Sequence, residues 1–321
     1  MSGGLVPWVV FVAAVATLLV IDLGVLGRRG EAMSTKTALA WSAMWIGLGL
    51  SFSLAVWRWF GATAAQEYIA GYLIEESLSI DNLFVFLLVF GSLGIALRYQ
   101  RKVLFWGILG AIVMRGLFIF AGVEVLERFS WVMYLFGALL LFTAVKLIRS
   151  HEVKVDPQRN PLVRLARRLL PVASDYEGSS FTVRRAGRLF VTPLAIALVA
   201  VESADLVFAV DSVPAVLAVT DETFVAFTSN VAAILGLRAL YFALAGSLQR
   251  FEYLSWGLAM VLGFVGAKML LADFIHVPIY MSLGVIVVAI GGSIIASLWL
   301  TRGKPVPAPE EAAPLCDTGE A

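Results

Sequence analysis

Nine runs of about 20 predominantly apolar residues follow one another along the sequence, and an α-helix of this length crosses the hydrocarbon core of a bilayer. Composition supports the same interpretation, because 60% of the 321 residues are hydrophobic and 15% are charged, against about 45–50% and about 25% in a soluble domain. We therefore predict an all-α, polytopic membrane protein with about nine transmembrane helices in a single transmembrane domain, residues 1–302. The helices are expected at residues 5–27, 38–60, 69–96, 102–124, 129–149, 189–219, 223–247, 252–272 and 277–300.

Basic residues between these runs predict the orientation, because cytoplasmic connections are enriched in Lys and Arg. The connections after the odd-numbered runs are the basic ones, so the N-terminus is expected outside and the C-terminus in the cytoplasm. Residues 150–188 form the longest connection, which we expect to be a basic cytoplasmic loop in contact with anionic lipid headgroups. Residues 303–321 contain four prolines and several acids, and are expected to be a disordered cytoplasmic tail.

The remaining composition limits the chemistry. Net charge is +1 and no block of basic residues indicates nucleic-acid binding. The only cysteine, Cys316, lies in the tail, which excludes a disulfide framework, a thiolate metal site or cysteine redox chemistry within the core. The N-terminal segment lacks the basic region of a signal peptide and its apolar run is too long for one, so we expect it to be a retained helix.

Two acidic stretches interrupt the apolar sequence. The first is EESLSIDN at residues 75–82, and the second is DLVFAVDS at residues 205–212. Aligned without gaps, Glu75 matches Asp205, Asp81 matches Asp211, and Asn82 matches Ser212. An acid, five residues, a second acid and a small polar side chain therefore occur twice.

Further matches extend this similarity. Arg128-Phe129 matches Arg250-Phe251 and Lys146 matches Lys268, both at an offset of 122. The sequence therefore predicts a repeat of three helices, helices 3–5 (about 69–149) and helices 6–8 (about 189–272). Because three is odd, the second copy must be inverted in the membrane, and inverted 3+3 repeats are typical of transporters.

Charged side chains within the spans must face the protein interior. Each ionised group at the bilayer centre costs about 2.5–3.5 kcal/mol on insertion scales, and five acids are affected: Glu75, Asp81, Glu202, Asp205 and Asp211. Arg115 and Arg238 are the expected counter-ions. Two arginines cannot neutralise five carboxylates, so we expect a divalent cation, protons or both to complete the site. A purely structural polar network is the alternative.

The ligand types indicate the class of ion. Carboxylates, Asn82, Ser212 and backbone carbonyls are hard oxygen donors that suit Mn²⁺, Mg²⁺ or Ca²⁺ without distinguishing among them. Histidine, which zinc and copper would favour, occurs only at predicted helix ends, as His151 and His276.

The spacing of the acids bears on the helix conformation. Six residues turn the second acid about 240° from the first on a continuous helix, whereas Glu75 and Asn82, seven apart, share a face. We therefore expect the acid-bearing helices to be unwound between their two acids. Pro214 favours this in the second stretch, because it removes the hydrogen bond to the carbonyl of Val210; in the first stretch the break is inferred by symmetry.

The paired motifs resemble those of the TerC family, integral membrane proteins named for tellurite resistance that include Alx-type manganese exporters. The resemblance runs from the first helix to about residue 300. It implies a bacterial inner-membrane protein that exports Mn²⁺, rather than Ca²⁺ or Mg²⁺, against a proton gradient. By position, it implies that Glu75, Asp81, Asp205 and Asp211 handle the metal, with Asn82 and Ser212 assisting. Candidate proton carriers or accessory ligands are Glu202, Glu76 and Asp22.

Two other classes of function are considered. A non-transporting membrane scaffold that delivers metal to secreted enzymes or supports stress resistance would use the basic loop and the tail as docking segments. An intramembrane aspartyl protease is disfavoured, because the sequence lacks the Gly-x-Gly-Asp pattern of those enzymes. We therefore expect a transporter that is not an enzyme and works by alternating access.

Overall fold

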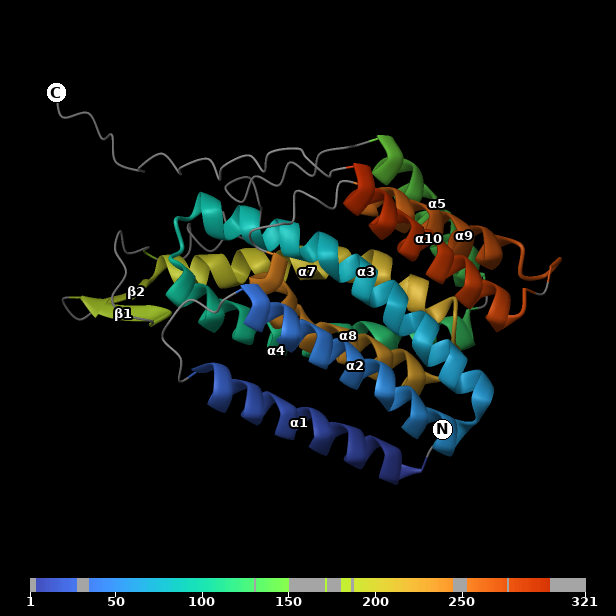
Figure 1. The fold of residues 1–321 in the computed structure, drawn as a ribbon, viewed down its shortest axis with the longest axis horizontal. Helices are drawn as coiled ribbons and strands as arrows, with labels where there is room; N and C mark the ends of the chain where they lie inside the picture. Colours follow the sequence, from blue (N-terminus) through green and yellow to red (C-terminus); the bar gives the residue numbers. More distant parts are fainter. Residues whose placement is uncertain are drawn as a thin grey trace.

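The computed structural model describes residues 4–27, 35–129, 131–149, 171, 180–185, 188–244, 253–275 and 277–300, and every structural statement below concerns these residues. Most of them are helical, in helices that lie side by side (Figure 1). The helices are α1 (Leu5–Gly27), α2 (Thr35–Phe60), α3 (Ala62–Ser92), α4 (Leu97–Arg128), α5 (Val132–Arg149), α7 (Pro193–Leu217), α8 (Thr223–Leu244), α9 (Leu254–Leu270) and α10 (Ile279–Leu300). The described part of the chain is thus mostly helical, as expected for an all-α membrane protein.

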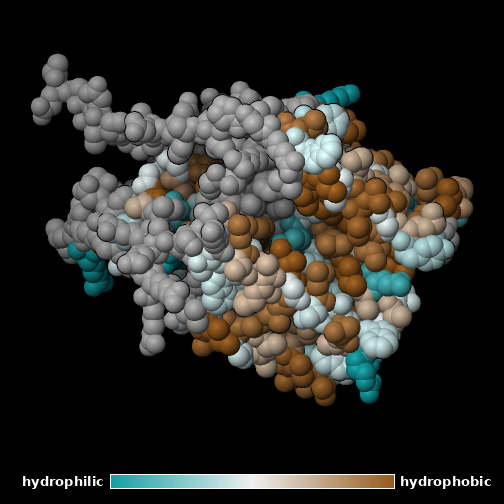
Figure 2. Space-filling view, viewed as in Figure 1, coloured by the Kyte–Doolittle hydropathy of each residue, from teal (hydrophilic) through white to brown (hydrophobic). Residues whose placement is uncertain are grey.

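Six of these helices, α2, α4, α5, α7, α8 and α10, are long and apolar enough to cross a membrane by length and composition. Their outward side chains are mainly apolar, as Val113 and Leu117 of α4 and Val288 of α10 illustrate. Figure 2 shows such hydrophobic side chains over much of the described surface that faces the viewer. An apolar exterior of this kind matches the surroundings that lipid tails provide.

The helices α3 and α7 form the centre of the structure and pack against each other. One apolar cluster joins the C-terminal half of α3, including Leu83, to the N-terminal half of α7, including Leu194. A second cluster joins Ile74 of α3 to Ala215 near the end of α7. The two helices are therefore antiparallel, as Figure 1 shows, and the residues between these clusters lie near the middle of both helices.

The other helices surround this pair. α8 packs against α3, α4 packs against α7, and α5 packs against α9. α2 lies over α3 and α8, α10 lies over α3 and α9, and α1 touches α8 at the edge of the bundle (Figure 1). Almost every described side chain of α8 is buried, so this helix is enclosed by protein rather than exposed to lipid.

A small hairpin precedes α7, and it corrects one predicted boundary. A helix was expected over 189–219, but β1 (Thr182–Arg185) pairs antiparallel with β2 (Arg188–Val191), and α7 begins only at Pro193. Proline favours the first turn of a helix, where its missing N–H is not needed. Thr192, just before it, donates a hydrogen bond from its hydroxyl to the Ser180 carbonyl (2.8 Å). Most of the loop 150–188 and the tail 303–321 lie outside the described residues.

The contact between α5 and α9 depends on two glycines. A Cβ on Gly266 would lie 2.8 Å from the carbonyl oxygen of Gly137, and a Cβ on Gly137 would lie 3.0 Å from that of Gly266. Small residues allow helix backbones to approach this closely. The α5–α9 crossing therefore has room for hydrogen at these two positions but not for a methyl group.

We predict that Gly266→Ala lowers the free energy of unfolding by about 1–3 kcal/mol, the usual cost of extra volume in a well-packed interface. Thermal unfolding in detergent would measure it. Gly263→Ala on the same helix is the control, because its methyl would meet only Ala144 Cβ at 3.8 Å, and alanine favours a helix over glycine by about 1 kcal/mol. Equal melting temperatures for the two variants would contradict the close crossing.

Candidate functional site

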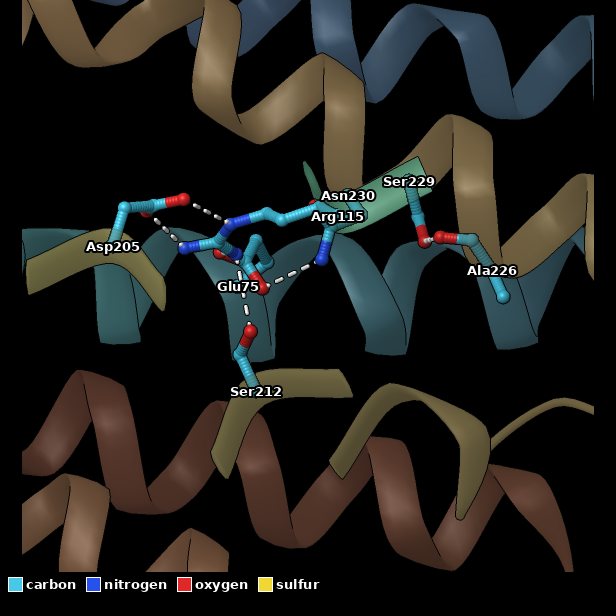
Figure 3. A network of polar contacts seen from close by, with 7 residues as sticks. All are labelled: Glu75, Arg115, Asp205, Ser212, Ala226, Ser229 and Asn230. Atoms are coloured by element: carbon cyan, nitrogen blue, oxygen red, sulfur yellow. Dashed lines mark hydrogen bonds and ion pairs between the residues drawn. The ribbon is translucent and has the colours of Figure 1, made fainter. Parts of the chain in front are cut away.

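A single arginine lies at the centre of the candidate site. Arg115, on α4, is 0% exposed and is the largest fully buried side chain among the described residues. Its guanidinium points between α3 and α7 at the middle of both helices (Figure 3). A guanidinium has five N–H donors in a planar fork and stays protonated in proteins. A positive charge is thus fixed in the interior, where it needs carboxylate partners.

Two carboxylates supply those partners. Asp205 of α7 accepts two hydrogen bonds, from Arg115 Nη2 at 2.9 Å and from Nε at 3.4 Å. Glu75 of α3 forms an ion pair with Arg115 Nη1 through Oε1, and its Oε2 accepts a hydrogen bond from Asn230 Nδ2 of α8 at 2.8 Å. When all three charged groups are ionised, their sum is −1.

Two neutral side chains complete the contacts of the guanidinium. Ser212 Oγ accepts a hydrogen bond from Arg115 Nη1 at 3.1 Å. With the Asn82 amide oriented so that its nitrogen donates to the Leu78 carbonyl, its oxygen accepts from Arg115 Nη2 at 3.2 Å. All five N–H donors of Arg115 therefore have a partner.

The spacing of these residues explains why they meet. Asn82 follows Glu75 by seven residues, and Ser212 follows Asp205 by seven. Seven residues are close to two helical turns, so each pair shares one face of its helix. The sequence predicted this for Glu75 and Asn82, and the same relation holds in α7.

The predicted unwinding between the acids is wrong for the described backbone. α3 is continuous from Ala62 to Ser92, and α7 continues past Pro214 to Leu217. Pro214 still leaves the carbonyl of Val210 without its helical hydrogen bond, but the loss of that one bond does not end the helix. The six-spaced acids of α7 consequently point in different directions.

Asp211 accordingly lies apart from Arg115. It is half-buried and faces α5, where Thr143 donates a hydrogen bond to its Oδ1 at 2.9 Å. Lys146, one turn further along α5, interacts with it electrostatically. Within the described residues no group of three or more His, Cys, Asp or Glu side chains is placed to hold a metal ion.

The remaining predicted residues occupy different surroundings. Glu202 of α7 lies against the backbone of α4 at Gly110, in space that a Cβ on that glycine would fill. Glu76 interacts electrostatically with Tyr72, one turn earlier on α3. Arg238, the second predicted counter-ion, is buried on α8 with 6% exposure. The side chains of Asp22 and Asp81 lie outside the part that the structure describes.

A second polar cluster lies toward the N-terminal end of α3. Thr220, just after α7, donates a hydrogen bond to Glu67 Oε2 at 2.7 Å. Lys268 of α9 donates to the Ala218 carbonyl at 3.3 Å and interacts electrostatically with Glu67. Polar groups therefore continue from the centre of the bundle past Asp211 toward this end.

Sequence reasoning missed Asn230 and Thr143. Asn230 ends the run Thr228-Ser229-Asn230, which is polar although it lies in an otherwise apolar helix. That run was a usable signal, because buried polar groups in a membrane helix need partners. Thr143 stands alone between apolar neighbours, and its sequence gives no comparable signal.

Apolar helices around a buried arginine and its carboxylates define the class: an integral membrane protein with a charged polar centre. Comparison with known proteins gives the family. The model of the "Integral membrane protein TerC family" matches residues 60–305, and the chain belongs to that family. No solved structure matches it.

Relatives match almost the whole chain. "Uncharacterized membrane protein STKORF319" of Myxococcus xanthus is 47% identical over 93% of this chain and 93% of its own length. "Putative membrane-bound redox modulator Alx" of Escherichia coli (strain K12) is 45% identical over 91% of this chain and 94% of its own length. An "Uncharacterized membrane protein" of Rickettsia bellii is 38% identical over 91% and 96%, respectively.

The contact between Asn230 and Glu75 generates a prediction. Replacing Asn230 with leucine, which has a similar shape, removes a donor to a buried carboxylate, and hydrogen bonds to charged groups contribute about 1.5–3 kcal/mol. We expect Asn230→Leu to lower the free energy of unfolding by that amount. The measurement is thermal or denaturant unfolding of the detergent-solubilised protein.

Thr228→Val is the matched control on the same helix. Thr228 is equally buried, but its hydroxyl bonds only to carbonyls of its own helix, with Phe224 O at 2.7 Å. No charged partner loses a donor, so its cost should stay below about 1 kcal/mol. If both variants were equally stable, the bond from Asn230 to Glu75 would have no energetic importance.

Proposed function

We propose that the protein exports Mn²⁺ across the bacterial inner membrane by alternating access, coupled to protons that move inward. The observation that carries this proposal is the convergence of four oxygen-bearing side chains on one buried point: Glu75 and Asn82 of α3 with Asp205 and Ser212 of α7. Two carboxylates, an amide and a hydroxyl are hard donors of the kind that bind Mn²⁺, Mg²⁺ and Ca²⁺. The family resemblance favours Mn²⁺ among these.

The second acid of each motif extends the proposed site into a path. Asp81 and Asp211 each lie six residues after the first acid, about 9 Å further along the helix axis. Because α3 and α7 are antiparallel, these positions lie on opposite sides of the centre. We propose that they receive and release the ion. Glu202, Glu76 and Asp22 are proposed proton carriers or accessory ligands.

The packing supports the proposed inverted repeat of α3–α5 and α7–α9. α3 packs against α8 as α7 packs against α4, and each helix of the first set also contacts its counterpart in the second. Nine spans are proposed by adding three helices to the six long apolar ones: α3, which is long but rich in acids, α1 with 23 residues and α9 with 17. The N-terminus is then outside and the C-terminus, with the basic loop, faces the cytoplasm and anionic lipid.

Protons are the proposed exchange partner because the carboxylates need neutralisation when the metal leaves. Glu75, Asp205 and Arg115 sum to −1 when ionised, and a net charge in the interior is costly. A proton that binds one carboxylate as the cation departs restores neutrality. The protein could then return to the state that faces the cytoplasm without a metal bound.

Mn²⁺ uptake into inside-out membrane vesicles tests the proposal, since uptake there corresponds to export. We predict that Glu75→Gln, Asp205→Asn, Asp81→Ala and Asp211→Ala each reduce the initial rate at least about tenfold, the effect of losing roughly 1.4 kcal/mol of ion stabilisation. Ser51→Ala is the control, because its exposed hydroxyl bonds within its own helix, to Leu48 O at 2.7 Å.

Three outcomes would count against all or part of the proposal. Equal Mn²⁺ accumulation by wild type and all four variants, at matched expression, would reject the site. Mn²⁺ binding without any flux in the wild type would instead favour a scaffold that delivers metal. Flux that ignores an imposed pH gradient would remove proton coupling alone.

A further inference from the structure

The ligand set proposed for the cation is already occupied by a positive charge of the protein itself. Oxygens of Glu75, Asp205, Asn82 and Ser212 all contact the guanidinium of Arg115, which belongs to a third helix, α4. Figure 3 shows the guanidinium between Glu75, Asp205 and Ser212. We infer that Arg115 is a tethered competitor of the transported cation: it holds these ligands when no metal is bound and leaves them before a metal binds.

This inference rests on the proposed function and follows from where the atoms lie. A divalent cation needs oxygens at about 2.0–2.6 Å. Both carboxylate oxygens of Asp205 are engaged by Arg115, at 2.9 and 3.4 Å, and Glu75 Oε1 is paired with it. An ion at the same oxygens would occupy the space of the guanidinium nitrogens. The two cations therefore exclude each other by volume as well as by like charge.

Charge makes the exchange feasible in a site remote from water. With the guanidinium in place, Glu75, Asp205 and Arg115 sum to −1. With a divalent cation in its place, the two carboxylates and the ion sum to zero, and the displaced guanidinium, which stays protonated, brings the sum of all four groups to +1. Neither state leaves both carboxylates unpaired, which is the arrangement that burial penalises most.

A competitor of this kind also gives the site a way to release its cargo. Binding that is too tight would prevent release to the other side of the membrane. When Arg115 returns to Asp205 and Glu75, its guanidinium replaces the ion at these carboxylates and prevents the ion from binding again. Apparent affinity is then set by the fraction of time for which the guanidinium is elsewhere.

A purely structural ion pair makes the opposite prediction. If Arg115 only held the helices together, its removal would loosen the ligand set, and Mn²⁺ would bind equally or more weakly. If Arg115 competes, its removal frees the ligands and Mn²⁺ binds more tightly. Because removing a nearby positive charge also favours a cation, the two roles are separated by the direction of the change in Arg115→Gln together with that in Arg115→Lys, which keeps the charge.

The test is equilibrium binding of Mn²⁺ to the purified full-length protein in lipid nanodiscs, for wild type, Arg115→Gln and Arg115→Lys. Removing a competitor that fills the site about nine-tenths of the time should tighten apparent binding about tenfold, so we expect that for Arg115→Gln. Lysine keeps the charge but has three donors without the planar fork. The apparent affinity of Arg115→Lys for Mn²⁺ should therefore lie between those of wild type and Arg115→Gln. Arg128→Gln, at the exposed end of the same helix, controls for the lost charge.

Thermal unfolding provides a second readout on the same samples. Mn²⁺ should raise the melting temperature of Arg115→Gln more than that of wild type, because the stabilisation by a ligand at a given concentration rises with the logarithm of its affinity. If Arg115→Gln does not fold, the comparison of Arg115→Lys with wild type shows whether the affinity for Mn²⁺ rises or falls. Unchanged or weaker Mn²⁺ binding in the folded variants, with wild type binding and transporting, would overturn this inference alone. If wild type showed neither Mn²⁺ binding nor Mn²⁺ flux, the proposed function would be rejected as well.

Discussion

The ion pairs of Arg115 with Asp205 and Glu75 constrain the packing of the whole centre. Arg115 is 0% exposed, and removing one partner of a buried pair typically costs about 3–5 kcal/mol because an unpaired charge is left behind. As long as Arg115 is paired with both carboxylates, α3, α4 and α7 therefore keep their relative positions along the membrane normal. A slide of α3 by one turn, about 5.4 Å, would separate Glu75 from the guanidinium. Apolar clusters on both sides, around Ile74 and Leu83, keep the pair in a low-dielectric interior.

Residue types and spacing were enough to predict much of this centre. The cost of charge in lipid indicated that the acids face inward, and the seven-residue spacing placed Glu75 and Asn82 on one face. Arg115 was predicted as a counter-ion because it was one of two arginines available within the spans. The family was also identified from the motifs, and the family model confirms it.

The sequence could not supply the crossings between helices. Which acid meets Arg115 depends on the rotation of α7 about its axis, and a continuous helix turns Asp211 toward Thr143 of α5 instead. The effect of Pro214 was misjudged, because the loss of the hydrogen bond to the Val210 carbonyl does not break α7, which continues to Leu217. Asn230 is on a helix whose contact with α3 becomes evident only from the packing.

Three glycines of α4 have a consequence for how the bundle can divide. A Cβ at Gly107, Gly110 or Gly122 would meet Val201, Glu202 or Leu217 of α7 closely, so α4 and α7 are closely packed along their length. Asn230 similarly links α8 to α3. Polar contacts from Arg115 to Glu75 and Asn82 join these two helix pairs at the centre, and Tyr241 of α8 donates a hydrogen bond to Gln100 of α4 at 2.8 Å toward one end. A rocking motion that separated the two pairs would have to break these contacts, and the guanidinium would then travel on the α4–α7 side.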